Sequence, residues 1–150
     1  METLVDTCKR TGFRIHSYVL MSNHYHLLME TPEANLVEGM RWFQGTYTAR
    51  FNSRHRQGGH VFQGRYKAIP IEGEESEYFR MASDYIHLNP VRLKAYEKTP
   101  QKEKLRLLLS YPWSSLHGYL RRKKKEAFID YSLVLGEYGG DTDKARKAYA

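Results

Sequence analysis

The chain has 150 residues, 41% of them hydrophobic, so it is long enough and apolar enough for one globular domain with a buried core. Its 24 Lys and Arg residues outnumber 17 Asp and Glu residues, and the formal net charge of +7 favours polyanionic partners. A single cysteine excludes an internal disulfide and a multi-cysteine zinc site, and no apolar run approaches the roughly 20 residues of a membrane span. Because the first residues also lack the pattern of a signal peptide, we expect a cytoplasmic protein without membrane contact.

The first elements expected along the chain are a helix and a β-hairpin. Apolar residues at helical spacing predict a short helix that ends near Gly12. Residues 13–21 then alternate between apolar and polar side chains, as a strand does. Ser22 and Asn23 indicate a turn, and residues 24–30 are expected to form the returning strand.

A long helix and a third strand are expected next. Asn35 and Glu38 resemble a capping box at the helix start. The apolar stripe of this helix consists of Leu36, Met40, Phe43, Tyr47 and Phe51. Residues 52–64 predict a loop, and residues 66–71 predict a strand that ends at residues 72–74.

Acidic residues at positions 74, 75 and 77 suit the first turn of another helix, because they face the positive end of its dipole. Its expected apolar stripe consists of Tyr78, Met81, Tyr85 and Leu88. Pro90 disfavours helical geometry at Asn89, so the helix should end there. A Leu-rich segment and the basic run 121–125 follow, and that run is expected to be a solvated helix end or a nonspecific DNA contact.

The tripeptide His24-Tyr25-His26 carries the clearest chemical signal. Residues two apart on a strand point the same way and lie roughly 6–7 Å apart, so both imidazoles can bind one metal ion. Neutral imidazole suits Mn²⁺, Zn²⁺, Ni²⁺ and Cu²⁺, and with oxygen ligands that complete the shell Mg²⁺ or Mn²⁺ becomes usable. His16 should point to the opposite face, which makes it a poor third ligand. By itself the pair also fits two polar residues on an exposed strand face.

Tyr85 and Asn89 are four residues apart and therefore share one helix face. The phenol of Tyr85 can act as a nucleophile, while the amide oxygen of Asn89 can reach a metal ion. A free phenol ionises only near pH 10, so it needs help from a metal on the scissile phosphate. The alternative is a buried tyrosine with a satisfied hydroxyl group. His87 lies between the two, and we expect it behind the metal ligands or on the surface.

A basic and aromatic segment lies between these motifs. Cations for phosphates beside flat rings for unpaired bases are typical of single-strand DNA binding. The alternative is a solvated basic loop that its aromatic residues anchor to the core. The candidate DNA-binding residues, together with one arginine after the tyrosine helix, are Arg50, Arg54, Arg56, Phe62, Arg65, Tyr66, Lys67 and Arg92.

Four phrases in this order resemble the HUH-type single-tyrosine transposases, and within them the REP-associated tyrosine transposase group. The phrases are YVLMSNHYHLL (18–28), GHVFQGRYKA (59–68), YIHLNPVR (85–92) and YPWSS (111–115). The resemblance implies an α+β, ferredoxin-like fold in which an antiparallel sheet is covered by helices. It also implies that His24, His26 and Asn89 hold a divalent metal, Mg²⁺ or Mn²⁺, and that Tyr85 is the nucleophile.

Members of this group cleave and rejoin single-stranded DNA near hairpins through a phosphotyrosine intermediate, so the resemblance implies single-stranded or hairpin DNA as partner. A homodimer is a further expectation. Relatives begin with an additional strand, which this sequence is expected to lack. We expect a catalytic core over residues 1–98 and a helical C-terminal extension over residues 99–150. Two alternatives stay open: a metal-dependent nuclease that uses water, and a DNA-binding protein without catalysis.

Overall fold

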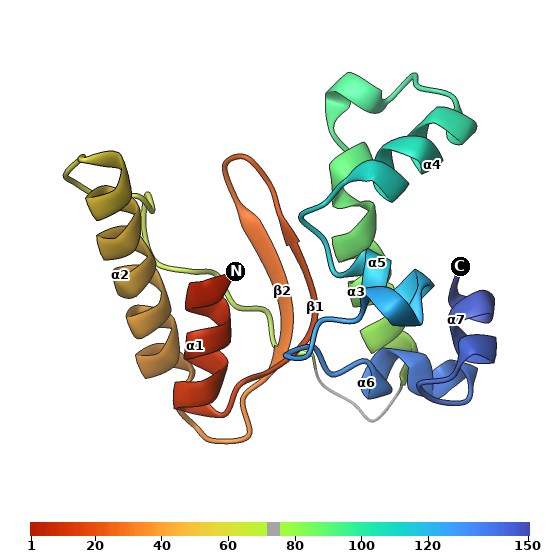
Figure 1. Ribbon diagram of the computed structural model, residues 1–150, viewed down its shortest axis with the longest axis horizontal. Coiled ribbons are helices and arrows are strands. Elements are labelled where there is room, and N and C mark those ends of the chain that lie inside the picture. The colour runs from red at the N-terminus through yellow and green to blue at the C-terminus, as the bar shows by residue number, and fades with distance from the viewer. Residues whose placement is uncertain (72–75) are drawn as a thin grey trace. The chain divides into compact units, whose positions relative to one another are not determined.

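The computed structural model describes residues 1–71 and 76–150, and within them it contains seven α-helices and an antiparallel sheet of two strands (Figure 1). The predicted α+β class is therefore confirmed. The chain divides into two compact units, one of residues 1–14 and 30–70 and one of residues 15–29 and 71–150. The expected boundary at residue 98 stays a prediction. Among the described helices, none combines the length and the apolar character that a membrane crossing requires.

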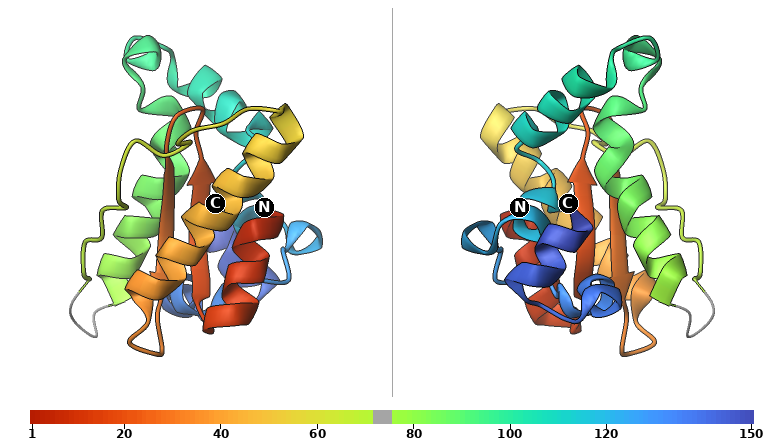
Figure 2. Two further views of the ribbon diagram at one scale, coloured as in Figure 1. Left: turned by 90° about the vertical axis from the view of Figure 1, so that its left-hand side faces the viewer. Right: turned by 90° about the vertical axis from the view of Figure 1, so that its right-hand side faces the viewer.

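The first unit is built on two helices, α1 (Glu2–Thr11) and α2 (Leu36–His55), which lie side by side (Figures 1 and 2). As predicted, α1 ends at Gly12, whose left-handed backbone (φ 73°) is free of strain in glycine. The buried ring of Phe13 packs directly against Gly39 of α2. A side chain at position 39 would occupy the space of that ring.

The start of α2 differs from the predicted capping box. Asn35 is the N-cap residue, as expected, but its side chain makes no capping hydrogen bond. Instead, its amide nitrogen donates to the backbone oxygen of Thr11 at 2.9 Å. Because this contact joins the end of α1 to the start of α2, tertiary packing has replaced the local cap.

The predicted strand over residues 66–71 is wrong. Residues 65–71 are irregular, and Ile69 is 88% exposed. A strand needs a ladder partner, and no described segment pairs with these residues. Pro70 also lacks the N–H group that a ladder requires. The predicted strand end at residues 72–74 and the acidic helix start at residues 74 and 75 lie outside the described residues.

The hairpin of the sequence analysis is present as β1 (Arg14–Leu20) and β2 (Tyr25–Glu30). The turn closes through a 2.8 Å hydrogen bond from the Met21 backbone N–H to the His24 oxygen. Along β1, Ile15 bridges to Ile129 in parallel fashion and Val19 bridges to Ser114 in antiparallel fashion. The C-terminal half of the chain thus stabilises β1 through backbone contacts.

The helix α3 (Ser76–Leu88) ends where Pro90 predicts, but its buried face is not the predicted one. The residues Tyr78, Met81, Tyr85 and Leu88 are all exposed. The core side of α3 consists of Ser83, Ile86 and His87. Polar side chains can occupy this face because their hydrogen-bonding groups find partners inside the protein.

The C-terminal half adds short helices around α3. They are η1 (Asn89–Val91), η2 (Lys94–Tyr96), α4 (Gln101–Ser110), α5 (Leu116–Leu120), η3 (Arg122–Lys124), α6 (Ser132–Leu135), η4 (Gly136–Tyr138) and α7 (Asp143–Tyr149). The extension is helical, as expected.

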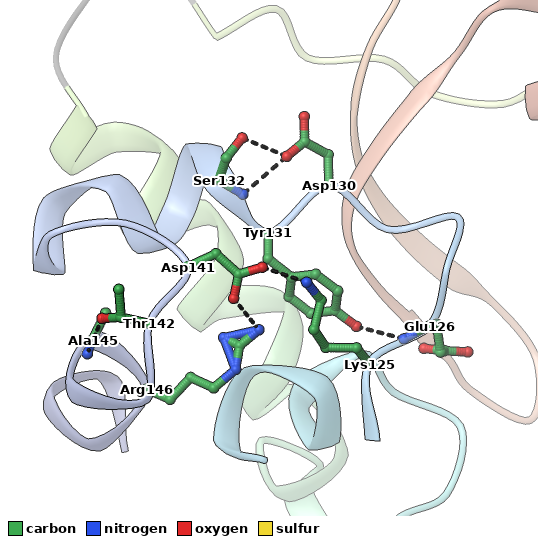
Figure 3. Close-up of polar contacts among 9 residues, drawn as sticks. All are labelled: Lys125, Glu126, Asp130, Tyr131, Ser132, Asp141, Thr142, Ala145 and Arg146. Atoms are coloured by element: carbon green, nitrogen blue, oxygen red, sulfur yellow. Dashed lines mark hydrogen bonds and ion pairs between the residues drawn. The ribbon is translucent and has the colours of Figure 1, made fainter. Parts of the chain in front are cut away.

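A buried arginine ties the last helices together (Figure 3). Arg146 of α7 is 2% exposed, pairs with Asp141 at 2.6 Å and stacks over the Tyr131 ring at 5.2 Å. Lys125, the last residue of the basic run, pairs with the same carboxylate. A carboxylate shared by two cations fixes the C-terminal helices to the segment before α6.

Candidate active site

The two histidines lie at the start of the returning strand. His24 directly precedes β2 and His26 is its second residue, so the alternation of the strand places both rings on one side. Their ring centroids are 5.1 Å apart and the planes are nearly perpendicular at 82°. The spacing is therefore short enough for both imidazoles to bind one ion.

Asn89 completes this cluster from a segment more than 60 residues away. It is the first residue of η1 and is 7% exposed. Its amide oxygen lies 3.4 Å from Nε2 of His24. On the other side of the same ring, Nδ1 lies 2.7 Å from the amide oxygen of Asn23.

The hydrogen-bond pattern of His24 determines what its ring can bind. When Nδ1–H donates to Asn23, Nε2 carries the lone pair and faces the oxygen of Asn89, which is also an acceptor. Two acceptors that converge in this way are stabilised by a cation or by a proton between them. Two ligand atoms about 2.1 Å from one ion lie about 3.0–3.4 Å apart, so the observed separation fits a shared metal ion.

The remaining possible metal ligands are limited. Within the described residues, no group of three His, Cys, Asp or Glu side chains converges. The oxygen that lies nearest to Nε2 of His24 in the contacts above is the amide oxygen of Asn89, which makes it the candidate for an additional protein ligand. His16 is buried, and its Nδ1 lies 3.1 Å from the backbone oxygen of Asp130. This agrees with the expectation that His16 is a poor third ligand. Two imidazoles and one amide oxygen suit a divalent ion that takes its other ligands from water and phosphate.

Tyr85 lies beside this cluster. Its ring stands edge-on to His26, with the centroids 5.6 Å apart, and it is 48% exposed. The guanidinium group of Arg92 lies 4.9 Å from the centre of the same ring. A tyrosine buried in the core, the alternative of the sequence analysis, is therefore ruled out at this position. An exposed phenol between a histidine pair and an arginine is accessible to a phosphate group.

Burial within this cluster lowers the pKa of His26, and the neighbouring His24 lowers it further. Both effects disfavour the charged imidazolium. Since only the neutral ring binds a metal ion, His26 keeps its binding form at more acidic pH than an exposed histidine does.

His87 is a buried structural residue, so the expectation of a surface position is wrong, and its ring nitrogens contact two hydroxyl groups instead of the candidate metal ligands. Its Nδ1 lies 2.7 Å from the Tyr149 hydroxyl and its Nε2 lies 2.8 Å from the Ser115 hydroxyl. Burial lowers the pKa of His87 to about 3. The neutral ring thus anchors α3, which carries Tyr85, to α7 and to the segment before α5.

The other predicted DNA-binding residues lie in the first unit, whereas all the residues of the cluster lie in the second. Arg50 forms a 2.8 Å ion pair with Asp6 and also contacts Thr3 at 3.2 Å. Arg54 lies in the last turn of α2 and Arg56 caps it. The segment after α2 carries four more: Phe62, Arg65, Tyr66 and Lys67.

Asn23 is the site residue that the sequence analysis missed, because it was interpreted only as part of a turn. Its contact with the outer nitrogen of a candidate metal-binding histidine gives it a second role, that of orienting the ring. The signals in the sequence were its position directly before His24 and its place within the phrase YVLMSNHYHLL.

The candidate metal ligands and Tyr85 belong to a segment that matches a known protein family. Residues 1–89 match the family model described as "Transposase IS200 like". No curated protein matches, and no solved structure matches. The matched residues include the histidine pair, Tyr85 and Asn89, and they span more than half of the chain. The chain therefore belongs to the IS200-like transposase family, which acts on DNA.

Proposed function

We propose that this protein cleaves and rejoins single-stranded DNA with Tyr85 as nucleophile and a divalent metal ion, Mg²⁺ or Mn²⁺, as cofactor. The observation that carries the proposal is the convergence of two distant chain segments, residues 24–26 and 85–89, on one spot. The Asn89 amide oxygen lies 3.4 Å from Nε2 of His24. The ring centroids of His24 and His26 are 5.1 Å apart, and those of His26 and Tyr85 are 5.6 Å apart. The family match supports DNA as substrate.

In this proposal, His24, His26 and Asn89 hold the metal ion. The chemistry that such an ion would supply is to withdraw charge from the scissile phosphate and to help orient it. Arg92, whose guanidinium group lies against the Tyr85 ring, adds a positive charge beside the phosphate. Asn23 keeps His24 in the tautomer that leaves Nε2 available.

The covalent step is a displacement at phosphorus. The Tyr85 oxygen loses its proton and forms a bond to the phosphorus atom, while the bond from phosphorus to the 3′-oxygen breaks. The 3′-oxygen takes up a proton and leaves as a free hydroxyl group, and the 5′-phosphate stays linked to Tyr85. Rejoining is the reverse attack by a 3′-hydroxyl, so no external energy source is required.

The proposed DNA contacts extend beyond the reacting phosphate. Arg54, Arg56, Arg65 and Lys67 are exposed cations that can neutralise phosphates, and Phe62 and Tyr66 offer rings to unpaired bases. Arg50 belongs to the proposed set as well, although it would share its charge with Asp6. We further propose that the protein cleaves next to hairpins, that it belongs to the REP-associated group and that it forms a homodimer.

The test uses a labelled single-stranded oligonucleotide with a hairpin, incubated with protein and Mg²⁺ or Mn²⁺. We expect an adduct of protein and DNA that survives denaturing electrophoresis and disappears with Tyr85→Phe. The matched control is Tyr78→Phe, because Tyr78 is an exposed tyrosine of the same helix, two turns away. It should form the adduct as the wild type does.

Three results would contradict parts of the proposal. An adduct that persists in Tyr85→Phe would show that another residue is the nucleophile. Cleavage without an adduct, unchanged by this substitution, would indicate a nuclease that uses water. Binding to hairpin DNA without cleavage in any divalent metal would leave a DNA-binding protein without catalysis.

A further inference from the structure

The C-terminal half of α2 carries aromatic side chains that have little core to pack against. The buried residues of α2 are Gly39, Met40 and Phe43, all in its first half. In Figure 1 the last turns of α2 extend beyond the N-terminal end of α1, the helix beside it. Tyr47, Phe51 and His55 follow at intervals of four residues, so they share one face of these turns.

These rings form a continuous aromatic row. The centroids of Tyr47 and Phe51 are 6.0 Å apart, and those of Phe51 and His55 are 4.3 Å apart. Phe62, from the segment after α2, joins the row at 5.7 Å from Tyr47. That segment is held back against α2 by a hydrogen bond from the Asn52 amide to the Gly59 oxygen at 2.9 Å.

The row is accessible to solvent along much of its length. Tyr47 is 36% exposed, His55 is exposed, and Phe51 and Phe62 are half-buried. Neighbouring planes are tilted by only 29–48°, so successive rings present flat surfaces in similar directions. A row of flat, accessible rings is a stacking surface for planar ligands.

The charge around the row indicates the class of ligand. From residue 39 to residue 71 the sequence contains six Arg and Lys residues and no Asp or Glu. Within the described chain, no carboxylate pairs with Arg54, Arg56, Arg65 or Lys67, which flank the row in the sequence. Exposed cations that flank accessible aromatic rings suit a polyanion that also carries flat bases.

We propose that the aromatic row of Tyr47, Phe51, His55 and Phe62 stacks the unpaired bases of single-stranded DNA. This inference rests on the proposed single-stranded substrate, but it concerns a different unit from the one that holds His24, His26, Tyr85 and Asn89. The stacking is tolerant of sequence, because every base has an aromatic face. The flanking cations contact the phosphates of the same strand.

The test compares binding of a fluorescent oligothymidylate with binding of an abasic strand of equal length. Tyr47→Leu keeps an apolar side chain, and His55→Ala changes an exposed residue at the end of the helix, so both variants should fold. We expect each to weaken oligothymidylate binding, Tyr47→Leu by about 5- to 150-fold, the usual loss for one stacked base. Binding of the abasic strand should not change.

The salt dependence separates stacking from phosphate contact. The slope of log affinity against log salt should be unchanged in Tyr47→Leu, whereas Arg54→Gln should reduce it by about 0.7. Val37→Ala is the matched control, since Val37 is an exposed apolar residue in the first half of α2, away from the row. It should bind both strands as the wild type does.

Unchanged oligothymidylate binding in both ring variants, or an equal loss on both strands, would overturn the inference. So would unchanged DNA binding combined with altered self-association in sedimentation, which would assign the row to a contact between two copies. At saturating DNA, the control variant Val37→Ala should form the Tyr85 adduct as the wild type does. Base-dependent binding without any adduct in the wild type would refute the proposed chemistry while leaving the stacking surface intact.

Discussion

Two glycines of the same helix should respond in opposite ways to the same substitution. Gly39 and Gly45 both lie within α2, where alanine is normally preferred. A β-carbon at position 39 would lie 2.2 Å from Cζ and 2.7 Å from Cε2 of Phe13, whereas one at position 45 would meet no atom within 4 Å. Gly39→Ala should therefore destabilise the protein, and Gly45→Ala should stabilise it.

The size of the effect follows from the packing. Carbon atoms normally approach to about 3.5 Å, so the ring of Phe13 must move by more than about 1 Å. It cannot swing into solvent, since it is only 4% exposed. Overpacking costs about 1–3 kcal/mol, and we take the upper end. After subtracting about 1 kcal/mol of helix preference, Gly39→Ala should lose about 2 kcal/mol, while Gly45→Ala should gain up to about 1 kcal/mol.

Urea-induced unfolding followed by circular dichroism measures both changes. Phe13→Leu shortens the side chain that the new methyl group meets, so Gly39→Ala should cost little in that background. A double-mutant cycle should yield a coupling of about 2 kcal/mol. If Gly39→Ala were as stable as Gly45→Ala, or if the cycle showed no coupling, the close packing of Phe13 on α2 would be refuted.

Three further predictions concern charged and titratable groups. Because folding lowers the pKa of His87 from 6.5 to about 3, the contribution of this group to stability is present above pH 6.5 and is lost as pH falls toward 3. The unfolding free energy of the wild type should therefore drop by about 2 kcal/mol between pH 6.5 and 4.5, and His87→Gln should lack this part of the drop. Asn23→Ala should weaken Mn²⁺ binding, measured by calorimetry, by about 10- to 100-fold. Asp141→Asn should cost about 3 kcal/mol in urea unfolding, because it leaves the buried Arg146 without its carboxylate, whereas Lys125→Gln should cost less than about 1 kcal/mol.

Each of these predictions has a distinct contradicting result. An acid-induced loss of stability of the same size in His87→Gln would assign the effect to other groups, and the pH series is best run with a chelator. Wild-type Mn²⁺ affinity in Asn23→Ala would show that His24 is oriented without its neighbour. Equal effects of Asp141→Asn and Lys125→Gln would mean that the buried arginine does not depend on this carboxylate.

The candidate site was largely predictable because each of its motifs is local. Two histidines at strand spacing, and a tyrosine and an asparagine one helical turn apart, share a face whatever the rest of the chain does. Predicting that these two motifs converge required the family resemblance of the four ordered phrases, because no helix or strand periodicity relates residue 24 to residue 89. The structure adds the 3.4 Å approach of the two side chains.

The errors arose where a local pattern depends on distant partners. The apolar stripe of α3 predicted the wrong core face, because Ser83 and His87 are buried and the hydroxyl groups of Tyr149 and Ser115 satisfy the imidazole. The pattern of residues 66–71 is that of a strand, but a strand forms only with a ladder partner. Asn35 marks the helix start correctly, yet its side chain bonds to the preceding helix.

The sequence by itself determined the helices and the hairpin turn, whose hydrogen bonds join residues only a few positions apart. It also determined the basic character of the chain and the chemical groups of the site. Tertiary structure alone decided which face of each helix is buried and which distant side chain approaches Nε2 of His24. It also decided that the rings of Tyr47, Phe51 and His55 stay accessible to solvent, whereas the ring of Phe43 in the same helix is buried. The physical reason is that burial and hydrogen-bond satisfaction depend on residues far along the chain, whereas helix and turn preferences do not.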